Sequence, residues 1–205
     1  MSSKGGLIVI SAPSGSGKTS LARRVLEEVP QLKFSVSHTT RKQRKGEQDG
    51  VEYYFVSKAE FEKMIEQDAF LEYAHVYGNC YATSRAFVES ELSCGNDVLL
   101  EIDVQGALKV KRLVPEATMV FVFPPSFEIL KERLEGRGLD DEAIIGRRLR
   151  IARNEIEYYR HYQYVIVNEN IERSVEDLKS IILAKRCGLS RRTFQAEQIL
   201  QTFKD

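Results

Sequence analysis

Residues 7–20 read LIVISAPSGSGKTS, and this stretch decides the fold. The opening run LIVI is unbroken and apolar, which is typical of a strand buried on both faces of a parallel sheet. Small residues and glycines follow it, and the segment LARRVLEEV after Ser20 then carries apolar residues at helical spacing until Pro30. We therefore predict a strand, a glycine-rich loop and a helix in direct succession.

Residues 12–19, APSGSGKT, match the phosphate-loop pattern G-x-x-x-x-G-K-[ST] except at its first position, where Ala12 replaces glycine. A loop without bulky side chains lets successive backbone N–H groups converge on phosphate oxygens, and the positive end of the helix dipole adds to the attraction. In this pattern Lys18 reaches the β- and γ-phosphates, and the Thr19 hydroxyl binds Mg²⁺. The predicted triphosphate-binding residues of the loop are Pro13, Ser14, Gly15, Ser16, Gly17, Lys18, Thr19 and Ser20.

The alternative for this loop is an ordinary glycine-rich turn with a solvated lysine. We prefer the phosphate loop because the motif follows a predicted buried strand and opens a helix. Alanine requires a negative φ at residue 12, so the beginning of the loop is expected to differ slightly from a glycine-led one.

Further apolar runs at residues 98–103, 119–123 and 164–167 each precede a helical pattern, and a long helix is predicted over about 141–159. This alternation indicates an α/β fold with a parallel sheet flanked by helices. Residues 34–93 differ, because polar β-prone pieces surround a helix that begins near Lys58 with a capping-box pattern. We divide the chain into a core with the phosphate loop (1–33), a small mixed α/β insertion (34–95), a core segment with a mobile lid at about 126–155 (96–187), and an extension (188–205) that is either an extra helix or a loose tail.

The composition excludes several classes of protein. The chain has 205 residues, and its 30 basic and 30 acidic side chains cancel, which argues against a dedicated nucleic-acid binder. No apolar run approaches the ~18 residues of a membrane span, and the start does not resemble a signal peptide. Three cysteines without metal-binding spacing indicate reduced thiols and a cytoplasmic location.

The zero net charge is unevenly distributed along the chain. Residues 1–50 carry nine basic and four acidic groups, whereas residues 51–103 carry three basic and eleven acidic groups. The basic segment 1–50 holds Arg41 and Arg44, and Tyr53 follows shortly after it. Planar guanidinium groups hold phosphate oxygens in a bidentate way that lysine cannot, although such a run on its own is usually a solvated face.

The acidic stretch offers hydrogen-bond acceptors for a nucleobase that is rich in hydrogen-bond donors. Guanine presents N1–H and its N2 amino group side by side, and one carboxylate can accept from both, whereas adenine has no such pair. Glu101 and Asp103 are two residues apart at the end of a predicted strand, and open parallel sheets bind ligands at that edge. The candidate residues of this stretch are Glu72, Tyr81, Thr83, Glu101 and Asp103.

A third group of charged residues surrounds Gly136 and Gly138. Positioned arginines stabilise the charge that spreads over a phosphoryl group in transfer. We expect two of the four arginines to act in this way and the others to be solvated. The four are Arg133, Arg137, Arg147 and Arg148.

From about residue 6 to residue 187 the chain resembles the guanylate kinases. The stretches that carry the resemblance are SAPSGSGKTS, FSVSHTTR-x-x-R-x-GE-x-x-G-x-x-Y-x-FV and LEIDVQG, together with PPS, LEGRG and VIVN. The resemblance implies a P-loop sheet, an inserted GMP-binding domain, a lid, and transfer of the γ-phosphate of ATP to GMP with Mg²⁺. It implies small-molecule partners only, with no nucleic-acid polymer and no membrane, and it leaves a homo-oligomer open.

The resemblance also implies roles for single residues. The GMP phosphate is held by Arg41, Arg44, Tyr53 and Tyr81. The guanine is read by Ser37, Glu72 and Thr83, with Asp103 nearby. Arg137 and Arg148 belong to the lid over the triphosphate, and Asn168 lies near the adenine. Residues 79–82 read NCYA where the family often has NYYG, so we expect a local backbone adjustment around Tyr81.

Two other functions compete with this interpretation. Guanylate-kinase-like domains also serve as interaction modules without catalysis, but those usually lack the complete phosphate loop or the full GMP set. A related kinase with a ribosyl phosphate acceptor is the second alternative. Glu72 and Thr83 argue against it, because an acceptor without a base has no use for them.

Overall fold

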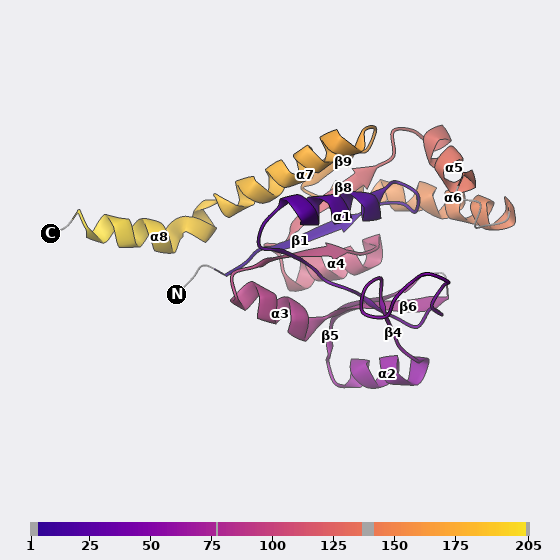
Figure 1. Cartoon of the computed structure of the whole chain (residues 1–205), viewed down its shortest axis with the longest axis horizontal. Helices are drawn as coiled ribbons and strands as arrows, with labels where there is room; N and C mark the ends of the chain where they lie inside the picture. Colours follow the sequence, from indigo (N-terminus) through magenta and orange to yellow (C-terminus); the bar gives the residue numbers. More distant parts are fainter. Residues whose placement is uncertain (1–3, 77, 137–141, 204–205) are drawn as a thin grey trace.

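The computed structural model describes residues 4–76, 78–136 and 142–203 of the chain, and a parallel sheet forms the centre of that part (Figure 1). Its strand order is β2 (Leu32–Phe34), β7 (Asp97–Glu101), β1 (Leu7–Ser11), β8 (Thr118–Phe123) and β9 (Tyr164–Val167). Every residue of β1 is buried, as expected for a strand with neighbours on both edges and helices on both faces. The predicted α/β class is confirmed.

Helices cover both faces of this sheet. On one face α1 (Lys18–Glu28) and α7 (Ile171–Arg186) pack against Ile8 and Ile10 of β1. On the other face α3 (Arg85–Ser93) and α4 (Val104–Leu113) pack against Leu7 and Val9. Alternate residues of the central strand therefore belong to two separate hydrophobic clusters, which hold the carboxyl end of the sheet in place.

The predicted insertion contains a second, mixed sheet below the first in the view of Figure 1. Its order is β4 (Tyr54–Phe55), β3 (His38–Thr39), β6 (Asn79–Ser84) and β5 (Phe70–Val76), and helix α2 (Lys58–Glu66) packs on it through Phe61. Ser57 and Glu60 form the predicted capping box at the start of α2. Strand β5 lies against α4, which joins the two sheets.

The remaining helices lie at the two ends of the molecule. Helices α5 (Phe127–Glu135) and α6 (Glu142–Ile156) pack together through Leu130, Leu134 and Ala152, and the short 3₁₀ segment η1 (Glu157–His161) follows α6. Helix α8 (Leu189–Gln201) ends the described chain, so the extension is an extra helix. In the described part of the chain, no helix is both long and apolar enough to span a bilayer.

Several boundaries differ from the sequence prediction. Strand β2 was not predicted, because three residues with a lysine in the middle give no apolar run. Strand β7 ends at Glu101 and not at residue 103, because the Asp103 side chain caps α4 by accepting from the backbone N–H groups of Gln105 and Gly106. The long helix ends at Ile156, where the chain tightens into η1.

Candidate functional site

The loop between β1 and α1 has the backbone conformation that its glycines allow. Gly15 and Gly17 have φ values of 97° and 86°, a region in which other residues are strained. Gly17 is the N-cap of α1, and among the described residues no side chain caps this helix. The first N–H groups of α1 are therefore free to bind an anion. Ala12 keeps a negative φ, as predicted.

Asn168, the residue after β9, packs against this loop. Its side chain is buried, with Nδ2 donating to the Ser16 carbonyl at 2.7 Å and Oδ1 accepting from the Ser174 hydroxyl at 3.1 Å. A Cβ at Gly17 would lie 2.3 Å from the Asn168 amide nitrogen, so this close approach requires glycine. The sequence resemblance places Asn168 near the adenine; in this structure its side chain contacts the phosphate loop.

The two reactive side chains of the loop reach the end of β7, which is the strand beside β1 in the sheet. Lys18 Nζ donates to the Ile102 carbonyl at 3.2 Å, and the Thr19 hydroxyl donates to Glu101 Oε1 at 2.5 Å. The structure thus brings the phosphate loop together with the acidic motif that the sequence predicts at the edge of the sheet. Hydroxyl and carboxylate oxygens are the ligands that Mg²⁺ prefers, so this pair suits that ion.

Glu72 and Thr83 form a buried polar pair between β5 and β6. The Thr83 hydroxyl donates to Glu72 Oε1 at 2.7 Å, and both residues are buried. Burial raises the pKa of Glu72 to about 7, the nearby charge of Asp103 adds to the rise, and the Thr83 hydrogen bond opposes it. A buried carboxyl with one hydroxyl partner is a strong acceptor for a ligand that brings its own donors.

Arg41 is held in a cluster with the aromatic side chains expected around the acceptor phosphate. Its guanidinium donates to both carboxylate oxygens of Glu47, at 2.7 and 3.1 Å, and lies 5.2 Å from the centre of the Tyr53 ring. The hydrogen bond from Arg41 lowers the pKa of Glu47. Tyr53 and Tyr81 meet edge to face at 5.8 Å between ring centres.

The Arg41 cluster and the phosphate loop are electrostatically linked through Tyr53. Burial raises the pKa of the Tyr53 hydroxyl to about 12, and the negative charge of Glu101 contributes to the rise. Glu101 in turn accepts the hydrogen bond from Thr19. Tyr53 in the Arg41 cluster thus feels the charge of the carboxylate that Thr19 contacts.

The other predicted residues lie at the edges of this region. Arg44 is exposed, and its backbone N–H donates to Glu47 Oε2 at 2.7 Å. Ser37 is half-buried, and its carbonyl accepts from the Tyr54 backbone. In the phosphate loop, the Pro13 carbonyl accepts from the N–H of Ser16, whose side chain is buried, while Ser14 is half-buried and Ser20 is exposed.

Helices α5 and α6 carry the predicted lid arginines. Arg133 Nη2 donates to the Asn168 carbonyl at 3.0 Å, which ties α5 to the residue beneath the phosphate loop. Arg148 is half-buried on α6, Arg147 is exposed, and Arg137 lies outside the described residues. The structure thus relates Arg133 to the loop through a contact that the motif pattern does not specify.

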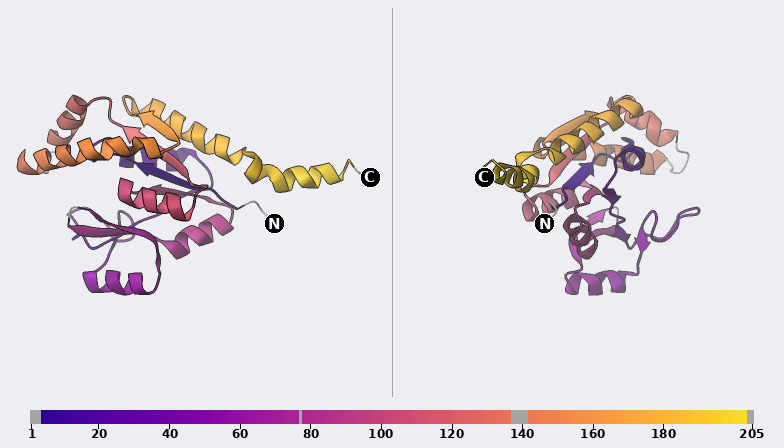
Figure 2. Two further views of the ribbon diagram at one scale, coloured as in Figure 1. Left: turned by 180° about the vertical axis from the view of Figure 1, so that it is seen from behind. Right: turned by 60° about the vertical axis from the view of Figure 1, so that its left-hand side comes forward.

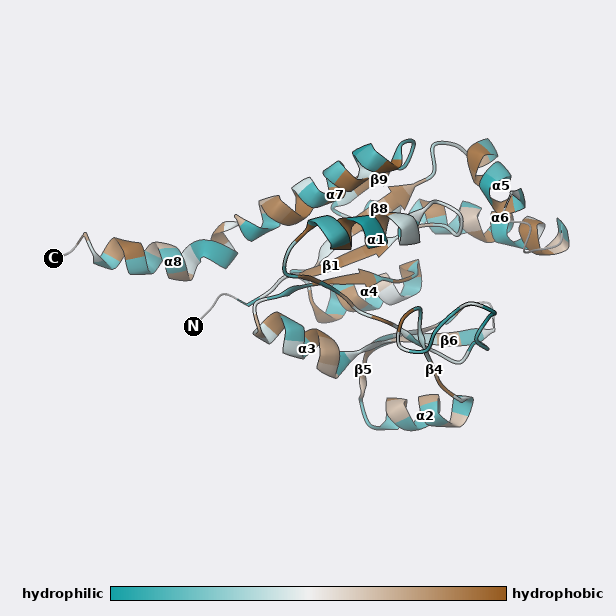
Figure 3. Ribbon diagram, viewed as in Figure 1, coloured by the Kyte–Doolittle hydropathy of each residue, from teal (hydrophilic) through white to brown (hydrophobic). Residues whose placement is uncertain are grey.

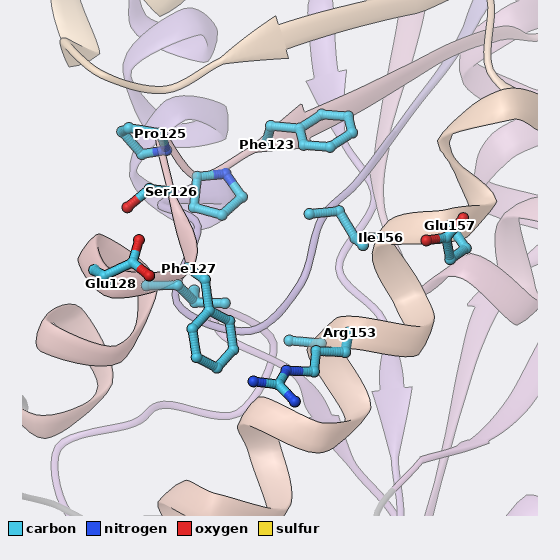
Figure 4. Close-up of a pocket in the computed structure, with 11 residues that line it drawn as sticks. Phe123, Pro125, Ser126, Phe127, Glu128, Arg153, Ile156 and Glu157 are labelled. Carbon is cyan, nitrogen blue, oxygen red and sulfur yellow. The ribbon is translucent and has the colours of Figure 1, made fainter.

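A separate pocket of about 600 Å³ lies between the end of β8 and helices α5 and α6 (Figure 4). It is lined mainly by apolar side chains, and Arg153 lies over the Phe127 ring at 4.5 Å. Of the predicted site residues that the structure describes, none lines it. The predicted residues and this cavity are therefore different places in the molecule.

Two carboxylates of this region were missed by the sequence analysis. Glu47 lies inside the GE motif, but its bidentate contact with Arg41 depends on the folded loop. Glu155 on α6 is half-buried, and burial raises its pKa to about 7, while the charge of Lys18 opposes the rise and Asp103 adds to it. No motif spacing signals Glu155, because only the packing of α6 brings it near Lys18.

Comparison with known proteins shows to which family the chain belongs. The guanylate kinase family profile matches residues 4–185. A guanylate kinase of Desulfitobacterium hafniense is 48% identical over 188 residues, covering 92% of this chain and 94% of the relative, and one of Hahella chejuensis is 51% identical over 187 residues, covering 91% and 90%. The crystal structure of guanylate kinase from Anaplasma phagocytophilum superimposes with a TM-score of 0.79 at 35% identity, covering 93% of this chain and 90% of that one. The chain therefore belongs to the guanylate kinase family.

Proposed function

We propose that this protein transfers the γ-phosphate of ATP to GMP, and also to dGMP, giving ADP and GDP, a step in purine nucleotide recycling and GTP supply. The observation that carries the proposal is the position of Glu101. It accepts from Thr19 of the phosphate loop at 2.5 Å, and its negative charge adds to the rise in the pKa of Tyr53, whose ring centre lies 5.2 Å from the Arg41 guanidinium. A donor triphosphate on the loop and an acceptor phosphate on Arg41 would therefore be neighbours.

The buried pair Glu72–Thr83 suits guanine as the base of the acceptor. The carboxylate of Glu72 would accept from N1–H and from the N2 amino group, while Thr83 holds the carboxylate in position. Ser37, Glu101 and Asp103 complete the GMP side in this proposal, and Arg44 and Tyr81 join Arg41 and Tyr53 on its phosphate. The adenine of ATP would lie near Asn168 in this proposal.

The transfer itself needs positioning and charge neutralisation. An oxygen of the GMP phosphate forms a bond to the γ-phosphorus, the bond from that phosphorus to the β-phosphate oxygen breaks, and ADP leaves with the electron pair. The attacking oxygen is already ionised near pH 7, so no general base is required. Lys18 neutralises the developing charge together with four arginines. These arginines are Arg41, Arg44, Arg137 and Arg148.

The residues at the phosphate loop fit a magnesium ion that accompanies ATP. Among the described residues no cluster of three or more His, Cys, Asp or Glu side chains could hold a metal by itself, which suits an ion bound mostly by phosphate oxygens and water. Thr19 would supply its hydroxyl to this ion. The ion supplies charge neutralisation of the triphosphate, and the Thr19–Glu101 bond holds that hydroxyl at the mouth of the loop beforehand.

The domain boundaries and the cellular setting belong to the same proposal. The insertion 34–95 would carry GMP and the segment at about 126–155 would close over ATP, excluding water as a competing acceptor. Free thiols at Cys80, Cys94 and Cys187 support a reducing compartment such as the cytoplasm. We propose small-molecule partners, with no nucleic-acid polymer and no membrane.

A coupled assay with ATP and Mg²⁺ tests the proposal by changing only the acceptor. GMP and dGMP are expected to release ADP rapidly, and AMP and a ribosyl phosphate slowly. Preference for an acceptor without guanine would overturn the assignment of Glu72 and Thr83. No ADP with any acceptor would instead favour a non-catalytic interaction module.

A further inference from the structure

Helix α4 lies between the central sheet and the second sheet, as the opposite views in Figures 1 and 2 both show. Ala107 and Val110 belong to the hydrophobic cluster on one face of the central sheet, and Figure 3 shows hydrophobic and hydrophilic residues together along this helix. Helix α4 also packs against β5, the strand that carries Glu72. The helix is therefore in a position to act on the residue that would read guanine.

Three residues at steps of three mark the side of α4 that faces Glu72. Asp103 caps the helix, Gly106 follows in its first turn, and Lys109 follows one turn later. Residues three apart are neighbours on a helix surface. A Cβ at Gly106 would lie 2.5 Å from Glu72 Oε2, so the carboxyl group packs directly against the backbone of α4. This side of the helix is thus the wall against which Glu72 rests.

Lys109 joins this wall to the second sheet. Its ammonium group donates to the Tyr73 carbonyl and lies 4.6 Å from the centre of the Tyr73 ring. Tyr73 directly follows Glu72, so both contacts hold β5 at the point where the Glu72 side chain leaves the backbone. The Lys109 side chain is half-buried, and a charge that is partly removed from water is less screened than a solvated one.

In the described part of the chain, the charged groups that shift the pKa of Glu72 are Asp103 and Lys109. Burial is the main cause of the raised pKa, and the negative charge of Asp103 adds to it, whereas the Thr83 hydrogen bond and the positive charge of Lys109 oppose it. Without Lys109, the buried carboxyl would bind a proton more readily. A protonated carboxyl presents an O–H donor, which does not suit the donor groups of guanine.

We propose that Lys109 is a positioning residue for guanine recognition, because it holds β5 on α4 and keeps the Glu72 carboxylate charged. The inference rests on the proposed function, since guanine is the ligand that Glu72 would read. Lys109 acts through Glu72 and Tyr73 and not through a contact of its own with the nucleotide. The affinity for GMP should therefore change with pH near neutrality, and Lys109 sets the range in which it changes.

The variant Lys109→Met removes the charge but keeps an unbranched side chain that packs on the Tyr73 ring. The KM for GMP should rise about 3- to 10-fold at about pH 6.5, because a larger fraction of Glu72 is protonated. This difference should fall below about twofold at about pH 9, where Glu72 is ionised in both proteins. The KM for ATP should stay constant. Lys109→Arg, which keeps the charge, should resemble the native chain, and the neutral Lys109→Gln should resemble Lys109→Met.

Lys111→Met is the matched control on the same helix. Lys111 is also half-buried, and its ammonium group also donates to a backbone carbonyl, that of His161. Its removal costs a similar hydrogen bond away from Glu72, so the KM for GMP should not change at either pH. An unchanged KM in Lys109→Met, a rise of equal size at both pH values, or a rise that Lys111→Met reproduces would each overturn the proposal.

Two further measurements isolate the action of Lys109 on Glu72. In the Glu72→Gln background, Lys109→Met should leave the KM for GMP unchanged within about twofold, because no carboxyl remains to be charged, and a larger rise overturns the proposal. Isotope-edited NMR of the side-chain carboxyl carbons in the nucleotide-free protein follows the titration of Glu72 without any reaction. Its midpoint should move to higher pH in Lys109→Met, and an unmoved midpoint overturns the inference. A moved midpoint in a chain that does not prefer guanine acceptors overturns the proposed function instead and confirms the effect of Lys109 on Glu72.

Discussion

The substitution Glu72→Gln is expected to make the protein more stable and less active at the same time. Burial raises the pKa of the Glu72 carboxyl to about 7 from an ordinary value of 4.5. A carboxyl whose pKa is raised on folding stabilises the fold fully only below its unfolded pKa, and this contribution is lost as the pH rises through the folded value. Glutamine has the same shape, can still accept from Thr83, and carries no charge.

The size of the stability effect follows from the shift in pKa. A shift of this size corresponds to about 3 kcal/mol when the carboxyl is fully ionised. The free energy of unfolding of the Glu72→Gln variant should therefore be close to that of the native protein at pH 4.5 and about 3 kcal/mol higher at pH 8.5. This difference corresponds to a rise of roughly 6–12 °C in Tm. Chemical denaturation of the nucleotide-free protein at both pH values measures the difference.

The effect on activity has the opposite sign. The amide would direct an N–H group at the donors of guanine and would remove a charged acceptor, a loss of about 1.5–3 kcal/mol in binding. The KM for GMP should rise about 10- to 150-fold, while the KM for ATP stays constant. A variant that is less stable at pH 8.5, or that binds GMP normally, would refute the assignment of Glu72 as a buried, charged reader of guanine.

Three further predictions concern the phosphate loop and the base of α8. Lys18→Ala should lower turnover by orders of magnitude while the melting temperature stays within about 2 °C, since the variant loses a 3.2 Å hydrogen bond to the Ile102 carbonyl. Near-normal turnover would remove Lys18 from the mechanism. Asn168→Ala leaves the Ser16 carbonyl without its side-chain donor, so it should lower the free energy of unfolding by about 1–3 kcal/mol and raise the KM for ATP. The control Asn170→Ala removes the cap of α7 and should lower the free energy of unfolding by about 1 kcal/mol without changing that KM. Equal KM values in the two variants would contradict the support of the loop by Asn168. Hydrogen bonds from Arg186, Gly6 and Arg191 lower the pKa of Asp97, although burial opposes this shift, so the stabilising effect of Asp97 should be lost as the pH falls below the ordinary carboxyl range. Asp97→Asn should lower the free energy of unfolding by about 3–5 kcal/mol at pH 7, measured by urea denaturation. A loss below about 1 kcal/mol would show that the buried charge is not what fixes this end of the sheet.

The sequence predicted the central architecture because its signals are local. The run LIVI, the glycine loop and the capping box at Ser57 each depend on a few adjacent residues, and the structure has all three. Strand β2 escaped prediction because its pairing with β7, and not its own three residues, makes it a strand. The extension remained undecided between helix and tail, since residues 188–205 hold no recognisable motif.

In the candidate site, local sequence motifs predict the residue types but not the contacts between distant segments. Motifs predicted the residue types around the phosphates, but the contact between Thr19 and Glu101 joins positions 82 residues apart. The place of Asn168 under Ser16 and of Glu155 near Lys18 results from the packing of β9 and α6. Such contacts depend on the relative positions of whole elements, which no spacing within one segment encodes.

The bidentate contact between Arg41 and Glu47 affects how the acceptor phosphate binds. With both oxygens of Glu47 on the guanidinium, the cation is already neutralised before any nucleotide arrives. An incoming phosphate exchanges one anionic partner for another, so much of the attraction it gains is offset by the contact it displaces. The acceptor site thus contains its own competing anion, which selects against weakly held ions such as chloride and favours ligands that bring many contacts at once.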